Sequence, residues 1–191
     1  YDVIVIGGGP AGYHAAIRAA QLGMKTACIN KMINKHDQPV LGGTCLNRGC
    51  IPAKAFLETA SVFRHVAHAA EFGIEASAPA VNFATTQARK AKIVDGLVKG
   101  IGGLCKSRKV TVFNGTGSLG AHRTVNITMA DGSTATAQGA SVILAAGSVP
   151  RTIPGFDRGG PIMTSDEVLM LDHVPARVAV IGGGAIGCEF A

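Results

Sequence analysis

The sequence has no tryptophan, only two tyrosines and few charged residues, which make up 16% of its 191 positions. It contains no apolar run near the ~18 residues that a membrane-spanning helix requires, and no signal-peptide pattern precedes its first apolar segment. Its five cysteines are odd in number and irregularly spaced, which argues against the disulfide framework of a small secreted protein. Since 47% of the residues are hydrophobic, we expect a soluble globular protein in a reducing compartment.

The sequence also lacks the features of a nucleic-acid-binding protein. The formal net charge is +6, and many basic residues fall between Arg89 and Lys109 at spacings typical of a solvated helix face. No aromatic residues alternate with them, and no recognition motif accompanies them. We therefore predict neither a nucleic-acid partner nor a membrane partner.

Glycine, in contrast, is abundant, with 26 of 191 residues. No Gly-X-Y period accompanies it, which excludes collagen. The apolar stretch Val3–Ile6 predicts a buried strand, and Gly7–Gly12 predicts a glycine-rich loop. An alanine-rich helix to about Leu22 and a second strand at Thr26–Ile29 then complete a βαβ unit.

Further helices and strands are predicted downstream of a polar loop at Lys31–Val40. One helix is expected to begin at Pro52 and to end at Gly73, and a second to run from about Thr86 to Lys106. The buried stripe of the second helix is predicted to contain Ile93, Leu97, Ile101 and Leu104. Short strands are predicted at Val110–Phe113, Thr124–Met129, Thr134–Ala137 and Val142–Ala145, with a hairpin turn at Asp131-Gly132.

The strand, glycine loop and helix pattern recurs near the end of the chain. Val178–Ile181 predicts a strand, and Gly182–Gly187 repeats the first loop 175 residues later (182 − 7). A connector rich in proline and glycine, Pro150–Pro161, precedes this repeat. We predict an α/β architecture with a doubly wound domain and an inserted antiparallel meander over residues 1–150. Residues 151–191 would form a connector and the truncated start of a second such domain.

Three glycines of the first loop match the dinucleotide-binding fingerprint G-x-G-x-x-G. Gly7 permits the tight turn, Gly9 lets the backbone approach a pyrophosphate, and Gly12 permits close packing of helix on strand. A tight turn without a ligand is the alternative interpretation. Two fingerprints in one chain indicate two nucleotides, such as a flavin and a nicotinamide. The acidic residue expected ~20 positions on is replaced by Asn30, which can still exchange hydrogen bonds with a ribose.

The second motif is Cys45-Leu46-Asn47-Arg48-Gly49-Cys50. Zinc binding is a competing interpretation, but no second cysteine or histidine pair lies at ligand spacing. A disulfide between Cys45 and Cys50 would need a distorted turn, because five helical residues rise about 7.5 Å, and Gly49 can permit it. The positive end of the helix at Pro52 would lower the pKa of Cys50, and Lys54 can face the same way. Two unrelated buried cysteines are the other alternative.

The remaining thiols and the histidines carry little predicted chemistry. Cys28, Cys105 and Cys188 are interpreted as inert core thiols. His65 and His68 could in principle share a metal, but no carboxylate or thiol partner is evident, so we interpret them as an exposed helix face. We therefore predict no metal site.

The segment from Gly42 to Pro52 resembles the redox-active signature of the FAD-dependent pyridine-nucleotide disulfide oxidoreductases. Within that family it is most similar to the branch that oxidises dihydrolipoamide. The resemblance extends over the whole chain and includes both fingerprints, the meander and Ala146-Gly147-Ser148. It implies a Rossmann-like FAD-binding domain with an inserted antiparallel β-meander, followed by the start of a Rossmann-like NAD domain.

The resemblance also implies roles for particular residues. Cys45 would exchange with the dithiol substrate, and Cys50 would lie against the flavin as a charge-transfer thiolate. Lys54 would approach the flavin and pair with Glu189. The residues implied to bind FAD are Gly7, Gly9, Pro10, Ala11, Gly12, Asn30, Gly43, Thr44, Cys45, Lys54, Gly117, Ala146, Gly147 and Ser148. Those implied to bind NAD are Gly182, Gly184, Ala185, Ile186 and Gly187.

The chain departs from the family pattern at three positions. Asn30 stands where the family has a ribose-binding Glu, Ala53 where Ser or Thr is common, and Ala146 where Thr is usual. The family's acid/base His–Glu pair comes from a C-terminal interface domain of the partner subunit, which we expect to follow Ala191 in a longer homodimeric enzyme.

The expected electron donor is the lipoyl domain of a 2-oxo acid dehydrogenase complex, and the expected location is the bacterial cytoplasm or the mitochondrial matrix. Two alternatives stay open. One is a related flavin enzyme, such as mercuric or glutathione reductase. The other is an FAD-binding module without turnover, which would describe the 191 residues taken alone.

Overall fold

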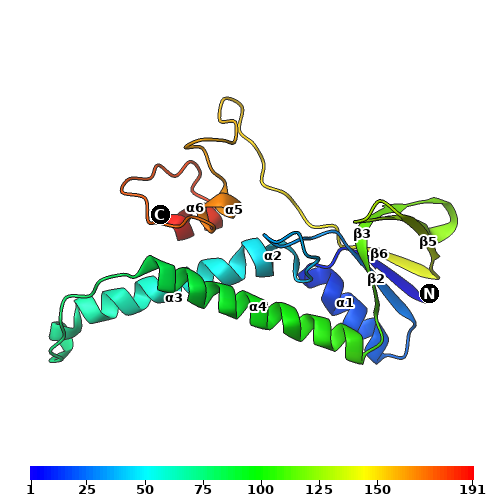
Figure 1. The fold of residues 1–191 in the computed structure, drawn as a ribbon, viewed down its shortest axis with the longest axis horizontal. Helices are drawn as coiled ribbons and strands as arrows, with labels where there is room; N and C mark the ends of the chain where they lie inside the picture. The colour runs from blue at the N-terminus through cyan, green and yellow to red at the C-terminus, as the bar shows by residue number, and fades with distance from the viewer. The chain divides into compact units, whose positions relative to one another are not determined.

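The computed structural model describes residues 1–191 and contains one six-stranded sheet with the order β5-β4-β3-β2-β1-β6 (Figure 1). β6, β1, β2 and β3 pair in parallel, whereas β3, β4 and β5 form an antiparallel meander. The strands are β1 (Val3–Ile6), β2 (Thr26–Asn30), β3 (Thr111–Leu119), β4 (Thr124–Met129), β5 (Thr134–Gln138) and β6 (Ser141–Leu144). The predicted mixed α/β fold with an antiparallel meander is therefore confirmed.

The N-terminal βαβ unit forms as predicted. Helix α1 (Pro10–Gln21) connects β1 to β2, and the two strands pair in parallel from Val3↔Thr26 to Ile6↔Ile29. The buried residues of α1 are Gly12, Ala16 and Ala19. Because these side chains are minimal, the helix can pack closely on the strands beneath it.

Strand β3 belongs to both parts of the sheet. Its first residues pair in parallel with β2, ending at Asn30↔Asn114. From Gly115↔Met129 onward the same strand pairs antiparallel with β4. The meander therefore grows out of the parallel sheet along one continuous strand, which makes β3 longer than the predicted strand Val110–Phe113.

The core of the sheet is shared between the parallel strands and the meander. Its buried members are Ile4, Ile6, Ala27, Ile29, Val125, Ile127 and Ala137. The alternate residues of β1 and β2 serve the opposite face, where Val5 and Cys28 are completely buried. Both faces of the central strands are thus covered, which explains their uninterrupted apolar sequences.

The chain divides into two compact units, which are described separately. Unit 1 comprises residues 1–47 and 95–149, and unit 2 comprises residues 48–94 and 150–191. Unit 1 holds the whole sheet, α1, the 3-10 turn η2 (Ala121–Arg123) and most of the short helix α2 (Gly43–Arg48). Unit 2 holds α3 (Cys50–Ala67), the 3-10 turn η1 (Ala69–Phe72), α5 (Ser165–Val168) and α6 (Ala185–Phe190). The long helix α4 (Phe83–Ser107) has residues in both units.

In unit 2, helix α3 and the first half of α4 lie side by side (Figure 1). The rings of Phe56 and Phe83 pack with their centroids 5.7 Å apart, and Arg89 donates to the carbonyl of Ala55 at 3.0 Å. The buried Lys90 ammonium lies 5.3 Å from the Phe56 ring centroid and donates to the Leu169 carbonyl at 2.8 Å. Lys90 therefore joins both helices to the segment after α5.

The predictions for the buried stripe of α4 and for residues 178–181 are wrong. The buried stripe of α4 in unit 1 consists of Ile101 and Cys105, whereas Leu97 and Leu104 are 44% and 49% exposed. Residues 178–181 form no strand, although they are apolar. A strand requires a hydrogen-bonding neighbour, and unit 2 contains no strand that could pair with this segment.

None of the helices is both long enough and apolar enough to cross a membrane.

The shared core gives a test of the fold. We expect Ile127→Ala to lower the free energy of unfolding by about 2–5 kcal/mol, since the side chain is 1% exposed between meander and sheet. Leu119→Ala in the neighbouring β3, where the side chain is 54% exposed, is the control and should cost less than about 1 kcal/mol. Urea denaturation measures both, and equal losses would show that the meander does not share the core.

Candidate functional site

The first fingerprint forms a tight turn that only glycine allows at two positions. Gly7 has φ +119°, and a Cβ there would lie 2.0 Å from the Ala145 carbonyl oxygen. A Cβ on Gly12 would lie 1.7 Å from the Gly7 carbonyl oxygen. Gly9 is the N-cap of α1, and no side chain caps that end of the helix. The backbone N–H groups of the first turn are therefore available to an anion such as a pyrophosphate.

The glycines before the cysteine motif pack directly on this turn. The Gly42 amide donates to the Gly8 carbonyl at 2.8 Å. Gly43 has φ +60°, and a Cβ there would lie 2.5 Å from the Gly9 Cα. The Asn47 side chain donates to the carbonyls of Leu41 and Gly43, which fixes the start of α2. The structure thus brings together two motifs that lie about 35 residues apart in the sequence.

A third segment, which follows β6, lies beside the same turn. The Ala145 amide donates to Ile6 at 2.8 Å, and the backbone of Ala145 and Ala146 lies against Gly7. Because β6 runs parallel to β1, the exposed residues Ala146, Gly147 and Ser148 follow the same end of the sheet as the fingerprint. This is the edge at which parallel α/β sheets bind their ligands.

Gly117, which the resemblance also implies to bind the flavin, lies where packing within the protein disfavours a larger side chain. It lies in β3, where a Cβ would be 3.2 Å from Ile29 and 3.4 Å from Val125. The meander core therefore accounts for this glycine, and its contact with a cofactor stays a prediction.

The two motif cysteines lie on successive helices. Cys45 is in α2 and half-buried, whereas Cys50 is the first residue of α3 and exposed. Gly49 between them has non-helical angles, φ −150° and ψ −116°, and accepts from the Ala53 amide at 3.0 Å as the N-cap of α3. The break at Gly49 is a distorted turn of the kind that a disulfide between Cys45 and Cys50 would need.

The start of α3 differs from the predicted start at Pro52. The helix begins two residues earlier, so Cys50 itself occupies the positive end of the helix and Pro52 is buried in the first turn. Ala53, one of the departures from the family pattern, is buried, 7% exposed. Pairing of Cys45 with Cys50 stays a prediction.

Tyr13 is a neighbour of the cysteine motif that the sequence did not reveal. It directly follows the last glycine of the fingerprint and is half-buried on α1. Burial raises the pKa of its phenol, and the nearby charge of the Cys45 thiolate raises it further. The sequence shows an aromatic residue one position after G-x-G-x-x-G. Its proximity to Cys45, however, follows only from the docking of α2 on the fingerprint.

Lys54 on α3 forms an ion pair with Glu189 on α6. The side chains are 57% and 31% exposed, and surface ion pairs of this kind contribute at most about 1 kcal/mol to stability. The contact implied by the resemblance is therefore present. Because this ion pair adds little to stability, its main effect is to position the Lys54 ammonium.

The second fingerprint adopts the backbone geometry of the first. Gly182 has φ +115° against +119° for Gly7, and a Cβ on Gly187 would lie 2.0 Å from the Gly182 carbonyl oxygen. Gly184 caps α6 with φ −76° and ψ 176°, against −78° and −175° for Gly9. The loop therefore forms its turn even though residues 178–181 do not join a sheet.

Asn30 ends β2 and is only 3% exposed. Its side-chain amide donates to the backbone carbonyls of Met32 and Val40. It therefore presents almost no surface to a ribose.

His14, His68 and His173 have local hydrogen-bond partners. The His68 Nδ1 lies 3.0 Å from the Glu71 carboxylate, and the exposed His14 bonds the Pro10 carbonyl. No group of three histidine, cysteine, aspartate or glutamate side chains could hold a metal ion.

The two buried thiols, Cys28 and Cys105, have raised pKa values. Burial, with the charge of Cys105 as a smaller cause, raises the pKa of Cys28 from 9.0 to about 12. Burial also raises the pKa of Cys105. These two thiols therefore stay protonated at neutral pH, as expected for inert core thiols, whereas the same prediction is wrong for Cys188, which is exposed.

This pKa shift predicts a loss of stability at alkaline pH. Below pH 9 Cys28 is protonated in both states, whereas between pH 9 and about 12 only the unfolded state loses the proton, so stability falls as pH rises. We expect the wild type to lose about 1 kcal/mol more than Cys28→Ala between pH 9 and pH 10. Urea denaturation at both pH values measures the difference, and parallel losses would contradict the assignment.

Comparison with known proteins bears on the whole chain. The family model for "Pyridine nucleotide-disulphide oxidoreductase" matches residues 1–191. The chain is 44% identical over 191 residues to a dihydrolipoyl dehydrogenase of Chlamydia pneumoniae, covering all of this chain and 40% of that protein. It is 40% identical to the Bacillus subtilis dihydrolipoyl dehydrogenase, again over all of this chain and 41% of the relative. A leghemoglobin reductase of Vigna unguiculata is 42% identical over 98% of this chain and 35% of its own.

Among solved structures, the HOCl-induced flavoprotein disulfide reductase RclA from Escherichia coli superposes with a TM-score of 0.78. The alignment covers all of this chain and 38% of that one, at 24% identity, and supports the fold. The chain thus spans about 40% of the length of the curated relatives that it matches.

Proposed function

This chain belongs to the pyridine nucleotide-disulphide oxidoreductase family, and we propose that the whole protein is a dihydrolipoamide dehydrogenase. It would oxidise protein-bound dihydrolipoyl groups, with FAD as its resident cofactor and NAD⁺ as the electron acceptor. The observation that carries this proposal is the docking of Gly42 and Gly43 on the first fingerprint. It brings Cys45 close to the phosphate cradle, which is the turn of Gly7–Gly12 with the N-terminus of α1.

The residues of the cradle fit the diphosphate of FAD. The turn at Gly7 and the uncapped N-terminus of α1 at Gly9 offer backbone amides, and side chains are excluded at Gly7, Gly12 and Gly43. Thr44 on α2 and the exposed residues 146–148 are the adjoining groups that would contact the rest of the cofactor. When bound, FAD accepts two electrons from a dithiol and passes them on as a hydride to a nicotinamide.

The chain's own chemistry is thiol–disulfide exchange. A substrate thiolate attacks the Cys45 sulfur of a Cys45–Cys50 disulfide, forms a mixed disulfide and releases Cys50 as a thiolate. The second substrate thiol, deprotonated by a base, then displaces Cys45 and leaves as the cyclic lipoyl disulfide. Two electrons and the protons of the dithiol have then passed to the enzyme. Cys50, the leaving thiolate of this exchange, is the first residue of α3.

Other residues orient this reaction. Lys54, held by Glu189, keeps a positive charge one helical turn after Cys50. The turn at Gly182 and the N-terminus of α6 would bind the pyrophosphate of NAD⁺ in the manner of the first fingerprint. We further propose a homodimer in which the partner subunit supplies the His–Glu acid/base pair. The electron donor would be the lipoyl domain of a 2-oxo acid dehydrogenase complex, in a bacterial cytoplasm or the mitochondrial matrix.

Substitution of the second motif cysteine tests the proposed function. In the complete enzyme we expect Cys50→Ser to keep its yellow flavin, to lose the long-wavelength band that appears on two-electron reduction, and to lose at least about 10³-fold in kcat with dihydrolipoamide. Absorption spectra under anaerobic titration and NADH formation measure these changes. Cys188→Ser, at an exposed thiol outside the motif, is the matched control and should retain both band and turnover. Turnover by Cys50→Ser would refute the mechanism.

The two fingerprints can be separated by matched substitutions. We expect Gly12→Ala in the complete enzyme to be purified with little flavin, because its Cβ meets the Gly7 carbonyl. Gly187→Ala makes the equivalent clash with Gly182, and it should retain flavin while raising KM for NAD⁺ at least about tenfold. Flavin absorbance and steady-state kinetics distinguish the variants. Loss of flavin from Gly187→Ala would contradict the assignment of the second nucleotide.

A further inference from the structure

Asn30 stands where the family has a ribose-binding Glu, and in this structure its side chain binds the backbone of its own segment. The Nδ2 donates to Val40 O at 3.1 Å and to Met32 O at 3.4 Å, while the Oδ1 accepts from Met32 N at 3.4 Å. Both partners of Nδ2 are carbonyl oxygens, which can only accept. The nitrogen of the amide must therefore face them, and both of its hydrogens are used.

The rest of the Asn30 side chain is covered by the fingerprint. A Cβ on Gly8 would lie 2.5 Å from the Asn30 Oδ1 and 2.8 Å from its Cβ, so the Gly8 backbone lies directly on the amide. Together with the 3% exposure of the residue, this leaves no free face for a ribose hydroxyl. The hydrogen-bonding capacity of Asn30 is directed inward.

The segment that Asn30 holds is a closed loop of residues 31–40. The Val40 amide donates to Met32 O at 2.9 Å, and Ile33 forms a β-bridge with Pro39. At the tip, the Asn34 Oδ1 accepts from the amides of His36 and Gln38 at 2.9 and 3.1 Å. Asn30 therefore binds both sides of the base of this loop, and Asn34 shapes its tip.

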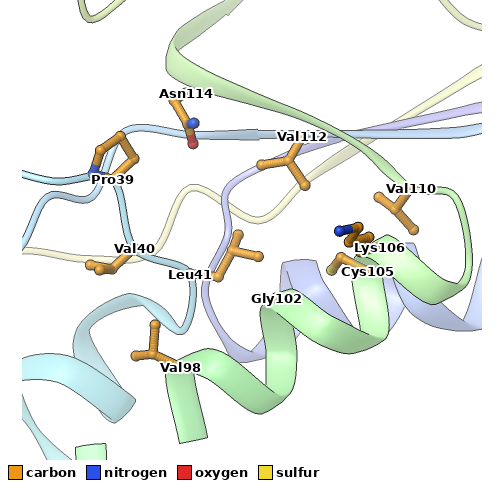
Figure 2. Close-up of a pocket in the computed structure, with 10 residues that line it drawn as sticks. All are labelled: Pro39, Val40, Leu41, Val98, Gly102, Cys105, Lys106, Val110, Val112 and Asn114. Atoms are coloured by element: carbon orange, nitrogen blue, oxygen red, sulfur yellow. The ribbon is translucent and has the colours of Figure 1, made fainter. Parts of the chain in front are cut away.

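The base of the loop leads straight into the cradle. Val40 is followed by Leu41 and by Gly42, whose amide bonds Gly8 at 2.8 Å. Pro39, Val40 and Leu41 also form one wall of a cavity of about 350 Å³, with Val98 and Cys105 of α4 on the opposite wall (Figure 2). A loop that opened at its base would displace both this wall and the glycines that dock on the fingerprint.

We propose that Asn30 is a positioning residue that holds the base of loop 31–40 closed and thereby presents Gly42 and Gly43 to the cradle, instead of binding the ribose. This inference rests on the proposed flavin function for its consequence, since a preformed cradle binds the cofactor more tightly than one that must order on binding. The hydrogen bonds that close the loop join protein atoms alone.

The isosteric change Asn30→Asp separates the two roles. It replaces both donors with an oxygen that faces the carbonyls of Met32 and Val40, so a positioning role predicts an opened loop. We expect FAD to dissociate from the full-length protein with a Kd raised at least about tenfold, which corresponds to about 1.4 kcal/mol. If residue 30 instead contacted the ribose, the Asn30→Asp variant would bind FAD as tightly as the wild type or more tightly.

The matched control is Asn34→Asp in the same loop. It introduces the same charge but keeps the acceptor oxygen that the amides of His36 and Gln38 use, so its Kd for FAD should equal that of the wild type. Asn30→Ala, which removes the donors without adding charge, should also weaken FAD binding. It serves as the second variant if Asn30→Asp does not fold.

Hydrogen exchange in the apoprotein decides the mechanism independently of flavin. We expect the amides of Val40 and Gly42 to exchange at least about tenfold faster in Asn30→Asp, while those of β1 are unchanged and report an intact sheet. A lower FAD affinity with unchanged exchange at Val40 and Gly42 would overturn the proposal, as would an unchanged or higher affinity. If the wild type bound no FAD, the proposed function would fail, and the exchange result would still decide the role of Asn30.

Discussion

The site depends on one close approach between two backbones. The hydrogen bond from Gly42 to Gly8 and the contact of Gly43 with Gly9 leave no space for a side chain between the fingerprint and the cysteine motif. The placement of the cysteine motif in unit 1 follows from it, because α2 starts at Gly43 and carries Cys45, whose charge acts on Tyr13 of α1. A side chain at Gly43 would meet the Gly9 backbone and push the two segments apart.

The α/β sheet around this contact brings the segments of the site to one edge. The parallel strands β6 and β1 finish at the same edge, so the residues after each of them meet there. The residues of β1 and β2 are buried on both faces, so the turn after β1 starts from a well-packed strand. Glycine turns at this edge are suited to a cofactor whose phosphates need backbone amides and whose reactive ring needs thiols nearby.

The buried polar residues show how the chain fixes its connecting segments. Asn30 holds loop 31–40 through two carbonyls, and Lys90 holds the segment after α5 through Leu169 while its charge lies over Phe56. In both cases a buried side-chain donor binds backbone carbonyls of an irregular segment. Loops placed in this way can contribute to a site with the precision of regular elements.

The local elements could be predicted from the order of the amino acids: the βαβ unit, both fingerprints, the break at Gly49 and the family signature of the cysteines. These depend on short-range rules, since glycine spacing, apolar runs and helix signals act within a few residues, and the second fingerprint forms its turn without a sheet. The burial of Asn30, the effect of Cys45 on Tyr13 and the exposure of Leu97 and Leu104 depend on the packing of distant segments. The absence of a strand at residues 178–181 also depends on distant segments. Each of these depends on which distant segment supplies a hydrogen-bonding or packing partner, and sequence periodicity does not contain that information.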